Sequence, residues 1–191
     1  MFYDFCVALL KVVFAFVFRI KRVGEENVPK EGPLIVAFNH TSDFDPVIAG
    51  ITCPRRLNFM AKAELFENKL FGGLIKRLGA FPVHRGKGDV GAIKTAFKII
   101  ENQGVMLIFP EGGRVKDGQR KSAKPGVAMI AQRCNVPVVP VHIIGEYKWM
   151  KKITVCYGAP VSFVNPSEAK PTQEDLQKFA DDVLDTIYSL S

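Results

Sequence analysis

A histidine and an aspartate, with four residues between them, directly follow an apolar run. Residues 33–39 predict an interior strand, and His40 and Asp45 come just after it. A carboxylate at this spacing can hydrogen-bond one imidazole nitrogen and leave the other nitrogen to accept a proton. The pair could therefore act as a general base with its orienting group. The alternative is that Asp45 only caps a helix beginning at Pro46, and that His40 is a hydrogen-bonded core residue.

Five more residues follow apolar runs in a similar way. They are Lys62, Arg85, Glu111, Gly112 and Arg114. In an open α/β sheet the ends of such strands converge on one crevice, so we expect these residues and His40 to face one cavity. The basic side chains suit a phosphate group, to which arginine can donate two parallel hydrogen bonds. The Gly112 backbone can pass close to a ligand, whereas Glu111 would orient Arg114 or a substrate hydroxyl.

Short apolar runs alternate with helical patterns along the body of the chain. The runs predict strands at 33–39, 57–61, 79–84, 105–109, 137–143 and 153–157, and the other segments predict helices near 46–52, 63–77, 89–102, 125–134 and from Thr172 onward. A length of 191 residues suits one domain. We therefore expect a single α/β domain with a mixed, largely parallel central sheet flanked by helices.

Four segments, in this order, resemble the 1-acyl-glycerol-3-phosphate acyltransferase family. Residues 40–45, 81–85, 109–114 and 136–141 correspond to His-x-x-x-x-Asp, a strand ending in arginine, Phe-Pro-Glu-Gly-x-Arg and a Val-Pro-x-x-Pro-Val strand. The resemblance covers roughly residues 20–160. It implies an enzyme of phospholipid biosynthesis that moves a fatty acyl group from a thioester to the sn-2 hydroxyl of 1-acyl-glycerol-3-phosphate, giving phosphatidic acid. Gly113 and Val115 depart from the pattern, because the family often has hydroxyl residues there.

The resemblance also implies roles for the residues. The acceptor would contact Arg85, Glu111, Arg114 and, less specifically, Lys62. Direct attack is favoured, with His40 removing the acceptor's proton and Asp45 holding the ring, because the chain has no Gly-x-Ser-x-Gly elbow for a covalent intermediate. Acyl-CoA or acyl carrier protein would be the co-substrate, and we expect no other cofactor and no metal. Glycerol 3-phosphate or another lysophospholipid is the alternative acceptor.

The amino-terminal residues are strongly apolar but carry spaced charges. On a helix, Asp4, Lys11, Arg19 and Arg22 would share one narrow stripe and leave a wide apolar face. The uninterrupted apolar part is shorter than the ~20 residues that a spanning helix needs. We therefore expect a membrane-interface helix over residues 1–22 and an acyltransferase domain over 23–191 that folds without residues 1–20. The alternatives are a helix docked on the protein's own core and a single membrane span.

Charge narrows the possible partners. The net charge is +7, and residues 165–191 hold six acidic and two basic side chains, so residues 1–164 are strongly basic. Such a body suits phosphate groups or anionic lipid, and we expect a monotopic or peripheral protein at the cytoplasmic face of the cell membrane. No basic helix or aromatic ladder indicates a nucleic-acid partner. The four cysteines show no short-spaced pair and fit a reduced compartment.

Two other functions each fit part of the sequence. Residues 86–91 match a dinucleotide-binding fingerprint, which would suit an oxidoreductase, but the strand before them is short and the turn is charged. A peripheral protein that only binds anionic lipid would explain residues 1–22 but not residues 40–45 or 109–114. Cofactor fluorescence would detect the first alternative, and liposome binding without thioester-dependent transfer would indicate the second.

Overall fold

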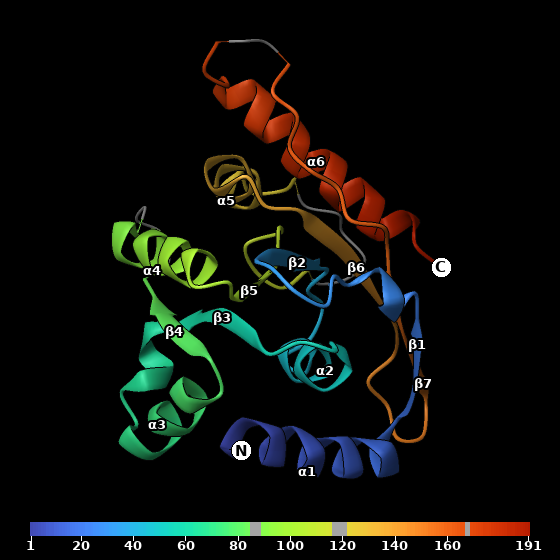
Figure 1. Ribbon diagram of the computed structural model, residues 1–191. Coiled ribbons are helices and arrows are strands. Elements are labelled where there is room, and N and C mark those ends of the chain that lie inside the picture. Colours follow the sequence, from blue (N-terminus) through green and yellow to red (C-terminus); the bar gives the residue numbers. More distant parts are fainter. Residues whose placement is uncertain (85–88, 116–121, 167–168) are drawn as a thin grey trace.

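Strands that are far apart in the sequence lie side by side in one sheet (Figure 1). The computed structural model describes residues 1–84, 89–115, 122–166 and 169–191. Within them, seven strands follow the order β1-β7-β6-β2-β5-β3-β4. Their bounds are β1 Arg19–Val23, β2 Leu34–Phe38, β3 Leu57–Lys62, β4 Ala80–Val83, β5 Val105–Ile108, β6 Val138–Gly145 and β7 Lys152–Tyr157. All neighbours are parallel except β6 and β7, which confirms the single α/β domain with a mixed, largely parallel sheet.

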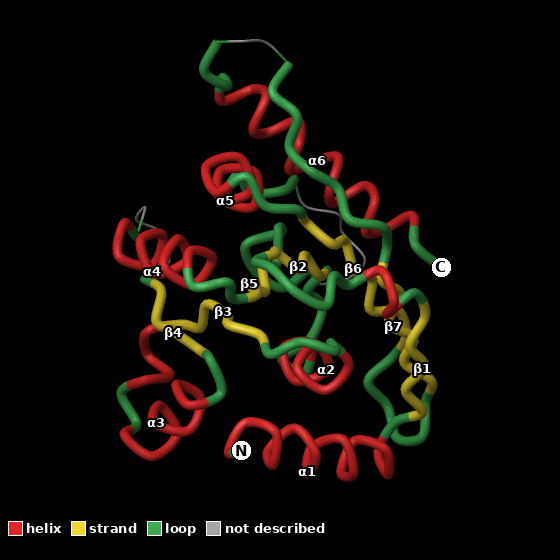
Figure 2. The backbone as a smooth tube through the Cα atoms, in the orientation of Figure 1, coloured by secondary structure: helices red, strands yellow, loops and turns green. Residues whose placement is uncertain are grey.

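Helices cover both faces of the sheet (Figures 1 and 2). Their bounds are α1 Phe2–Val17, α2 Asp45–Thr52, α3 Lys69–Arg77, α4 Val90–Glu101, α5 Gly126–Cys134 and α6 Gln173–Ser189, with short 3₁₀ turns at η1 Glu25–Asn27 and η2 Ala63–Phe66. The helices α1 and α2 pack on one face, and α4, α5 and α6 pack on the other, so each face has its own hydrophobic core. The helix α3 lies beside β4 at one edge of the sheet (Figure 1).

The central strand β2 explains where the polar residues of the site stand. All five of its residues are fully buried, as expected for a parallel strand covered on both faces. It pairs with β6 on one side and with β5 on the other, and β5, β3 and β4 continue in parallel. The carboxyl ends of β2, β5, β3 and β4 therefore share one edge of the sheet. His40, Glu111 and Lys62 follow or end these strands, and this places them at that edge.

The amino terminus differs from the predicted helix over residues 1–22. The helix α1 ends at Val17, Phe18 adopts an extended conformation, and residues 19–23 form β1, which pairs in parallel with β7. The helix is therefore shorter than predicted, because its last predicted residues form a strand. The physical reason is that β7 offers a free hydrogen-bonding edge, and pairing with it satisfies the backbone of a short basic segment whose own sequence fits either structure.

The helix α1 is apolar on two faces, one that is buried against the protein and one that is exposed. Phe14, together with Phe18 just beyond the helix, is buried in the core that also holds α2. The opposite face exposes Phe2, Phe5, Leu9, Val12, Val13 and Phe16. The helix is thus docked on the protein and also presents an apolar surface outward. In the described parts of the chain, no helix is long and apolar enough to cross a membrane.

Removing residues 1–20 is now expected to leave a protein that is insoluble or lacks cooperative unfolding. The deletion takes away Phe14 and Phe18 and shortens β1, and replacing one buried phenylalanine by alanine already costs ~3–5 kcal/mol. A matched pair tests this by chemical denaturation. Phe18→Ala should lower the free energy of unfolding by that amount, whereas Phe16→Ala, on the exposed face, should change it by less than ~0.5 kcal/mol. A truncated protein that unfolds like the full chain would contradict the docked arrangement.

Candidate active site

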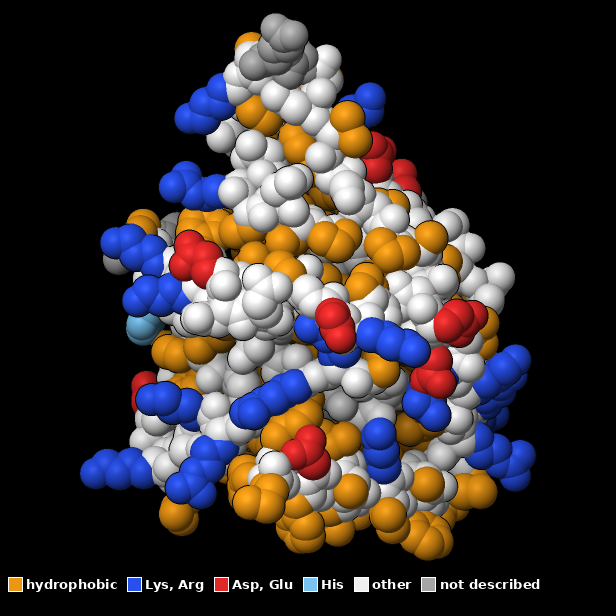
Figure 3. All heavy atoms as spheres, in the orientation of Figure 1, with side chains coloured by type: hydrophobic (Ala, Val, Ile, Leu, Met, Phe, Trp, Pro, Cys, Tyr) orange, Lys and Arg blue, Asp and Glu red, His pale blue; other side chains and the backbone are white. Residues whose placement is uncertain are grey.

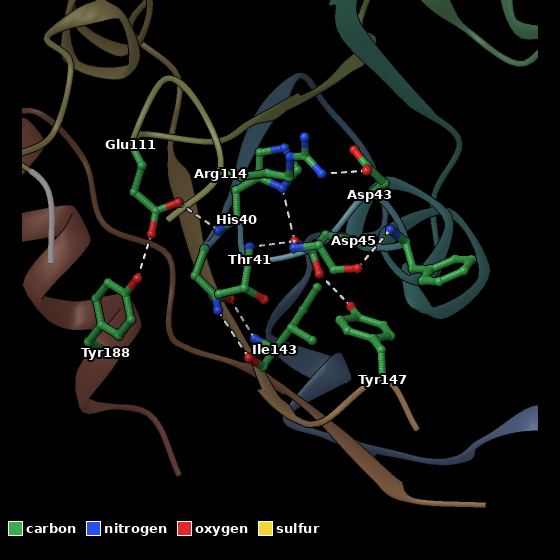
Figure 4. Close-up of polar contacts among 12 residues, drawn as sticks. His40, Thr41, Asp43, Asp45, Glu111, Arg114, Ile143, Tyr147 and Tyr188 are labelled. Atoms are coloured by element: carbon green, nitrogen blue, oxygen red, sulfur yellow. Dashed lines mark hydrogen bonds and ion pairs between the residues drawn. The ribbon is translucent and has the colours of Figure 1, made fainter. Parts of the chain in front are cut away.

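His40 and Asp45 are in direct contact at the carboxyl edge of β2 (Figure 4). The Nδ1 atom of His40 lies 2.9 Å from Oδ2 of Asp45, and both side chains are buried. Asp45 was expected to cap α2, but Phe44 is the N-cap and Asp45 is the first helical residue. Its carboxylate points back to His40 instead of to the amides of the first helical turn. The predicted contact between His40 and Asp45 is therefore present, although Asp45 does not cap the helix as expected.

The Asp45 carboxylate is surrounded by hydrogen-bond donors. The backbone amides of Thr41 and Ser42 donate to Oδ2 at 2.6 and 2.7 Å, and the hydroxyl of Tyr147 donates to Oδ1. Burial and the adjacent Asp45 charge raise the pKa of the Tyr147 phenol, which keeps it a proton donor. Because these three groups only donate here, the carboxylate is an acceptor, and Nδ1 of His40 carries the proton. The Nε2 atom is then the nitrogen with a lone pair.

The loop after β5 holds His40 from three directions. The ring stacks on Phe109, with centroids 4.1 Å apart and an interplanar angle of 20°. The backbone amide of His40 donates to Glu111 Oε2 at 2.6 Å, and its carbonyl accepts from the Val115 amide at 2.8 Å. The histidine is thus fixed through its ring and through both of its backbone polar groups. Such preorganisation is what a positioned base requires.

The Glu111 carboxylate bonds to groups of the protein itself, and its predicted contact with substrate stays a prediction. It is only 2% exposed, and its second oxygen accepts from the hydroxyl of Tyr188 on α6 (Figure 4). Burial raises the pKa of the Glu111 carboxyl, and the hydrogen bonds from Tyr188 and His40 partly offset that increase. The carboxylate therefore links the backbone of His40 to the carboxy-terminal helix. We interpret it as a positioning residue.

Two of the three predicted basic residues, Lys62 and Arg114, are described and lie at the same edge of the sheet. Arg114 forms an ion pair with Asp43, which belongs to the loop between His40 and Asp45. Lys62 ends β3 with an exposed side chain. Arg85 lies outside the described residues, as does the first half, residues 86–88, of the predicted dinucleotide fingerprint.

The Gly112 backbone has φ +68°, and a Cβ there would lie 2.8 Å from Cγ of Lys124, so this turn requires glycine. The conformation of the turn is thus sufficient to explain why residue 112 is a glycine. The expected close approach to a ligand stays a prediction.

Sequence reasoning missed three residues that complete the site. Tyr147 lies 102 residues from Asp45, and Tyr188 lies 77 residues from Glu111, so no local pattern joins them. Asn39 also escaped notice. Its side chain donates to the carbonyl of Ile143 at 3.0 Å and accepts from the amide of Ile143 at 2.7 Å, which extends the pairing of β2 with β6 by one residue.

Comparison with known proteins agrees with this geometry. Residues 19–144 match the Acyltransferase family. The chain is 34% identical over 144 residues to the 1-acyl-sn-glycerol-3-phosphate acyltransferase of Bacillus subtilis, a match covering 75% of this chain and 71% of that protein. It is 32% identical over 155 residues to the enzyme of that name from Streptococcus pneumoniae, covering 80% of this chain and 55% of that protein.

The fold is also similar to a solved structure. The crystal structure of the 1-acyl-sn-glycerophosphate (LPA) acyltransferase PlsC from Thermotoga maritima has a TM-score of 0.77 and 25% sequence identity, and the match covers 98% of this chain and 78% of that one. The resemblance inferred from the sequence motifs is thereby confirmed. The chain belongs to the acyltransferase family and is an O-acyltransferase of the group that contains the 1-acyl-glycerol-3-phosphate acyltransferases.

Proposed function

We propose that this enzyme transfers a fatty acyl group from a thioester to the sn-2 hydroxyl of 1-acyl-glycerol-3-phosphate. The acceptor oxygen attacks the thioester carbonyl, the carbon–sulfur bond breaks, and phosphatidic acid and a free thiol are the products. The observation that carries the proposal is the contact between His40 Nδ1 and Asp45 at the carboxyl edge of the sheet. The names of the relatives from Bacillus subtilis and Streptococcus pneumoniae support the choice of acceptor.

The histidine acts as the general base in this proposal. With Nδ1–H directed at Asp45, the Nε2 lone pair of His40 takes the proton of the acceptor hydroxyl as the new ester bond forms. The Asp45 carboxylate balances the charge on the imidazolium, which then returns the proton to the departing sulfur. General-base assistance of this kind is typically worth ~10²–10⁴-fold in rate.

Direct attack is preferred over a covalent acyl-enzyme. The four cysteines are free thiols, and burial raises the pKa of the Cys53 thiol to about 11. Burial also raises the pKa of the thiols of Cys134 and Cys156, so these three are poor nucleophiles near neutral pH. The base therefore serves the acceptor hydroxyl itself.

The acceptor phosphate would bind the basic residues at the same edge. Arg114 is the best placed of those described, because its ion pair with Asp43 holds it over the loop that joins His40 to Asp45. Asp43 is exposed, so a phosphate can replace or share this carboxylate at little cost. Arg85 and Lys62 are proposed as further phosphate contacts.

Arg114→Ala is expected to raise the KM for the acceptor by roughly ten- to a hundred-fold and to leave the KM for the donor nearly unchanged. The variant loses a charge-assisted hydrogen bond of ~1.5–3 kcal/mol. Steady-state kinetics with each substrate varied in turn measures the two constants. A phosphate-free acceptor is the control, because the substitution should hardly affect it. Equal defects toward both acceptors would refute phosphate binding by Arg114.

The acceptor and donor are tested in one assay of thiol release. The enzyme is offered 1-acyl-glycerol-3-phosphate, glycerol 3-phosphate and other lysophospholipids, each with acyl-CoA and with acyl carrier protein. The highest kcat/KM is expected for 1-acyl-glycerol-3-phosphate. A clear preference for glycerol 3-phosphate would replace the proposed reaction with acylation of that acceptor.

We also propose that the enzyme acts as a peripheral or monotopic protein at the cytoplasmic face of the membrane. The exposed apolar face of α1 supports this, since a lipid acceptor and product reside in the bilayer. The same helix reaches the catalytic loop, because Phe14 and Phe18 contact the ring of Phe44 at centroid distances of 6.0 and 6.3 Å. The carboxyl end of α1 thus packs against the loop that joins His40 to Asp45.

A further inference from the structure

A basic cavity lies at the amino end of α1, against α3 and the residues just before β3. Its volume is about 370 Å³, and it is lined by Met1, Phe2, Tyr3, Arg56, Lys76 and Arg77. Three of these six side chains are cationic. The proposed reaction makes no use of them, because Arg56 precedes β3 and Arg77 precedes β4. They therefore stand at the amino end of the strands, opposite the catalytic edge.

The two arginines are held in place by aromatic rings of α1. The guanidinium carbon of Arg56 lies 4.9 Å from the ring centroid of Tyr3, and that of Arg77 lies 5.6 Å from that of Phe2. Arg56 also donates to the carbonyl of Arg77 at 3.2 Å. The Tyr3 hydroxyl accepts from the Leu57 amide at 3.3 Å, which fixes the ring. Cation–π stacking orders a guanidinium while its N–H groups at the rim stay directed outward.

Apolar surface surrounds this cavity. The exposed face of α1 begins at Phe2 and Phe5, and α3, which lies beside the amino end of α1, exposes Leu70, Phe71 and Leu74 (Figure 1). In Figure 3 apolar side chains line the lower edge of the molecule over α1, with Lys and Arg side chains grouped directly above and beside them. Cations next to an apolar plane match the headgroup layer that borders the hydrocarbon of a bilayer.

We propose that this cavity binds the phosphate of an anionic lipid headgroup and orients the enzyme on the bilayer. The inference rests on the proposed membrane association, and it adds a second phosphate site distinct from the acceptor's. The 16 residues of α1 span ~24 Å, and the far end of the helix packs on the catalytic loop. One lipid is therefore held at the amino end of α1 while the reacting lipid enters at its carboxyl end.

The cations that follow α1 do not line this cavity. Arg19, Lys21 and Arg22 belong to β1 at an edge of the sheet. Arg22 forms an ion pair with Glu25 at 2.6 Å. The cavity brings together three cations from two other segments, and its nearest carboxylate by sequence, Asp4, forms an ion pair with the amino group of Met1 at 2.8 Å.

The test compares vesicle flotation of the full chain and of Arg56→Gln/Lys76→Gln/Arg77→Gln. Vesicles contain phosphatidylcholine alone or with phosphatidic acid. The variant should bind the anionic vesicles about 100-fold more weakly, at about fivefold for each base removed. A matched control, Lys94→Gln/Lys98→Gln/Lys178→Gln, removes the same charge from α4 and α6 on the other side of the sheet and should bind within about threefold of wild type. Equal losses in both variants would overturn the site.

Two further variants separate charge from packing. Arg56→Lys/Arg77→Lys keeps the charges but not the planar stacking, and it should retain most of the anionic binding. Loss of binding in this variant would assign the effect to the packing of α1 and overturn the proposal. Lys76→Glu, at the exposed end of α3, should by itself weaken binding to anionic vesicles about 25-fold, because it changes the charge by two units. It should have little effect on folding, and unchanged binding would count against the cavity.

The remaining outcomes separate a lipid phosphate from a soluble phosphate, and they separate the cavity site from membrane association in general. Inorganic phosphate at constant ionic strength should not displace the protein, and displacement would reassign the cavity to a soluble phosphate. Wild type that binds both vesicle types equally would remove the cavity site but leave membrane association standing, whereas binding to neither would remove both. Transfer to a water-soluble acceptor should be unchanged in the triple variant, because the catalytic edge is not altered.

The chain's single tryptophan reports which face is docked. Trp149 is 72% exposed and lies near the carboxyl end of α1, because the next residue donates from its amide to the Val17 carbonyl at 2.8 Å. Its fluorescence should shift to the blue when anionic vesicles are added. Binding without such a shift would show that another face meets the membrane and would overturn the proposed orientation.

Discussion

Replacing His40 by alanine is expected to lower kcat for acyl transfer by at least ~10²–10⁴-fold, the share that a general base supplies. The fold should survive, because the Asp45 carboxylate keeps its donors from Thr41, Ser42 and Tyr147. The substitution leaves both backbone hydrogen bonds of position 40 in place. Thiol release under saturating donor and acceptor measures the rate, and thermal unfolding checks the fold. A folded variant with more than a few per cent of wild-type turnover would exclude His40 as the base.

The Asp45→Asn substitution is expected to reduce kcat by a similar order. In the histidine–aspartate pair of serine proteases the same change costs about 10⁴-fold, because the amide favours the wrong imidazole tautomer. Here the substitution is also expected to lower the free energy of unfolding. An asparagine has one acceptor oxygen, whereas donors surround both oxygens of the Asp45 carboxylate. Leaving a buried donor unsatisfied costs ~1–3 kcal/mol, so the free energy of unfolding must be measured with the rate.

Asp43→Asn is the matched control for that substitution. It makes the same chemical change two residues away, at an exposed carboxylate that pairs with Arg114. Its kcat should stay within a few-fold of wild type, and the acceptor KM should change more than kcat. If the two variants lost kcat equally, the orientation of His40 by Asp45 would not be the cause.

Much of the fold could be predicted from the sequence because each element carries its own signal. Strand β2 is a continuous apolar run, and α6 begins with a Thr172 capping box that the structure retains. The strand β1 could not be predicted in this way. Its sequence is short and basic, and it becomes a strand only because β7 lies next to it. Pairing between segments more than 130 residues apart leaves no trace in the local pattern.

In the candidate site, too, contacts within a local motif could be predicted and contacts between distant segments could not. The contact between His40 and Asp45 follows from their spacing, and the third motif contributes Phe109 and Glu111 from one short loop. The direction of each side chain was less predictable. The bonds that the Glu111 carboxylate accepts from the His40 amide and the Tyr188 hydroxyl could not be predicted from the motif, because their partners lie 71 and 77 residues away in the sequence. Tyr147 and Tyr188 come from segments without any motif, so only the packed structure reveals them.

The hydrogen bonds that join His40 to Glu111 and Glu111 to Tyr188 determine when, during synthesis and folding, the enzyme can become active. Glu111 follows His40 by 71 residues, and Tyr188 follows Glu111 by a further 77. During synthesis the histidine leaves the ribosome well before the groups that hold its backbone, and at ~5–20 residues per second this interval lasts many seconds. A nascent chain can thus pair β2 and β5 while its base is still poorly held. Full catalytic activity should therefore not be reached before α6 has docked and Tyr188 holds Glu111.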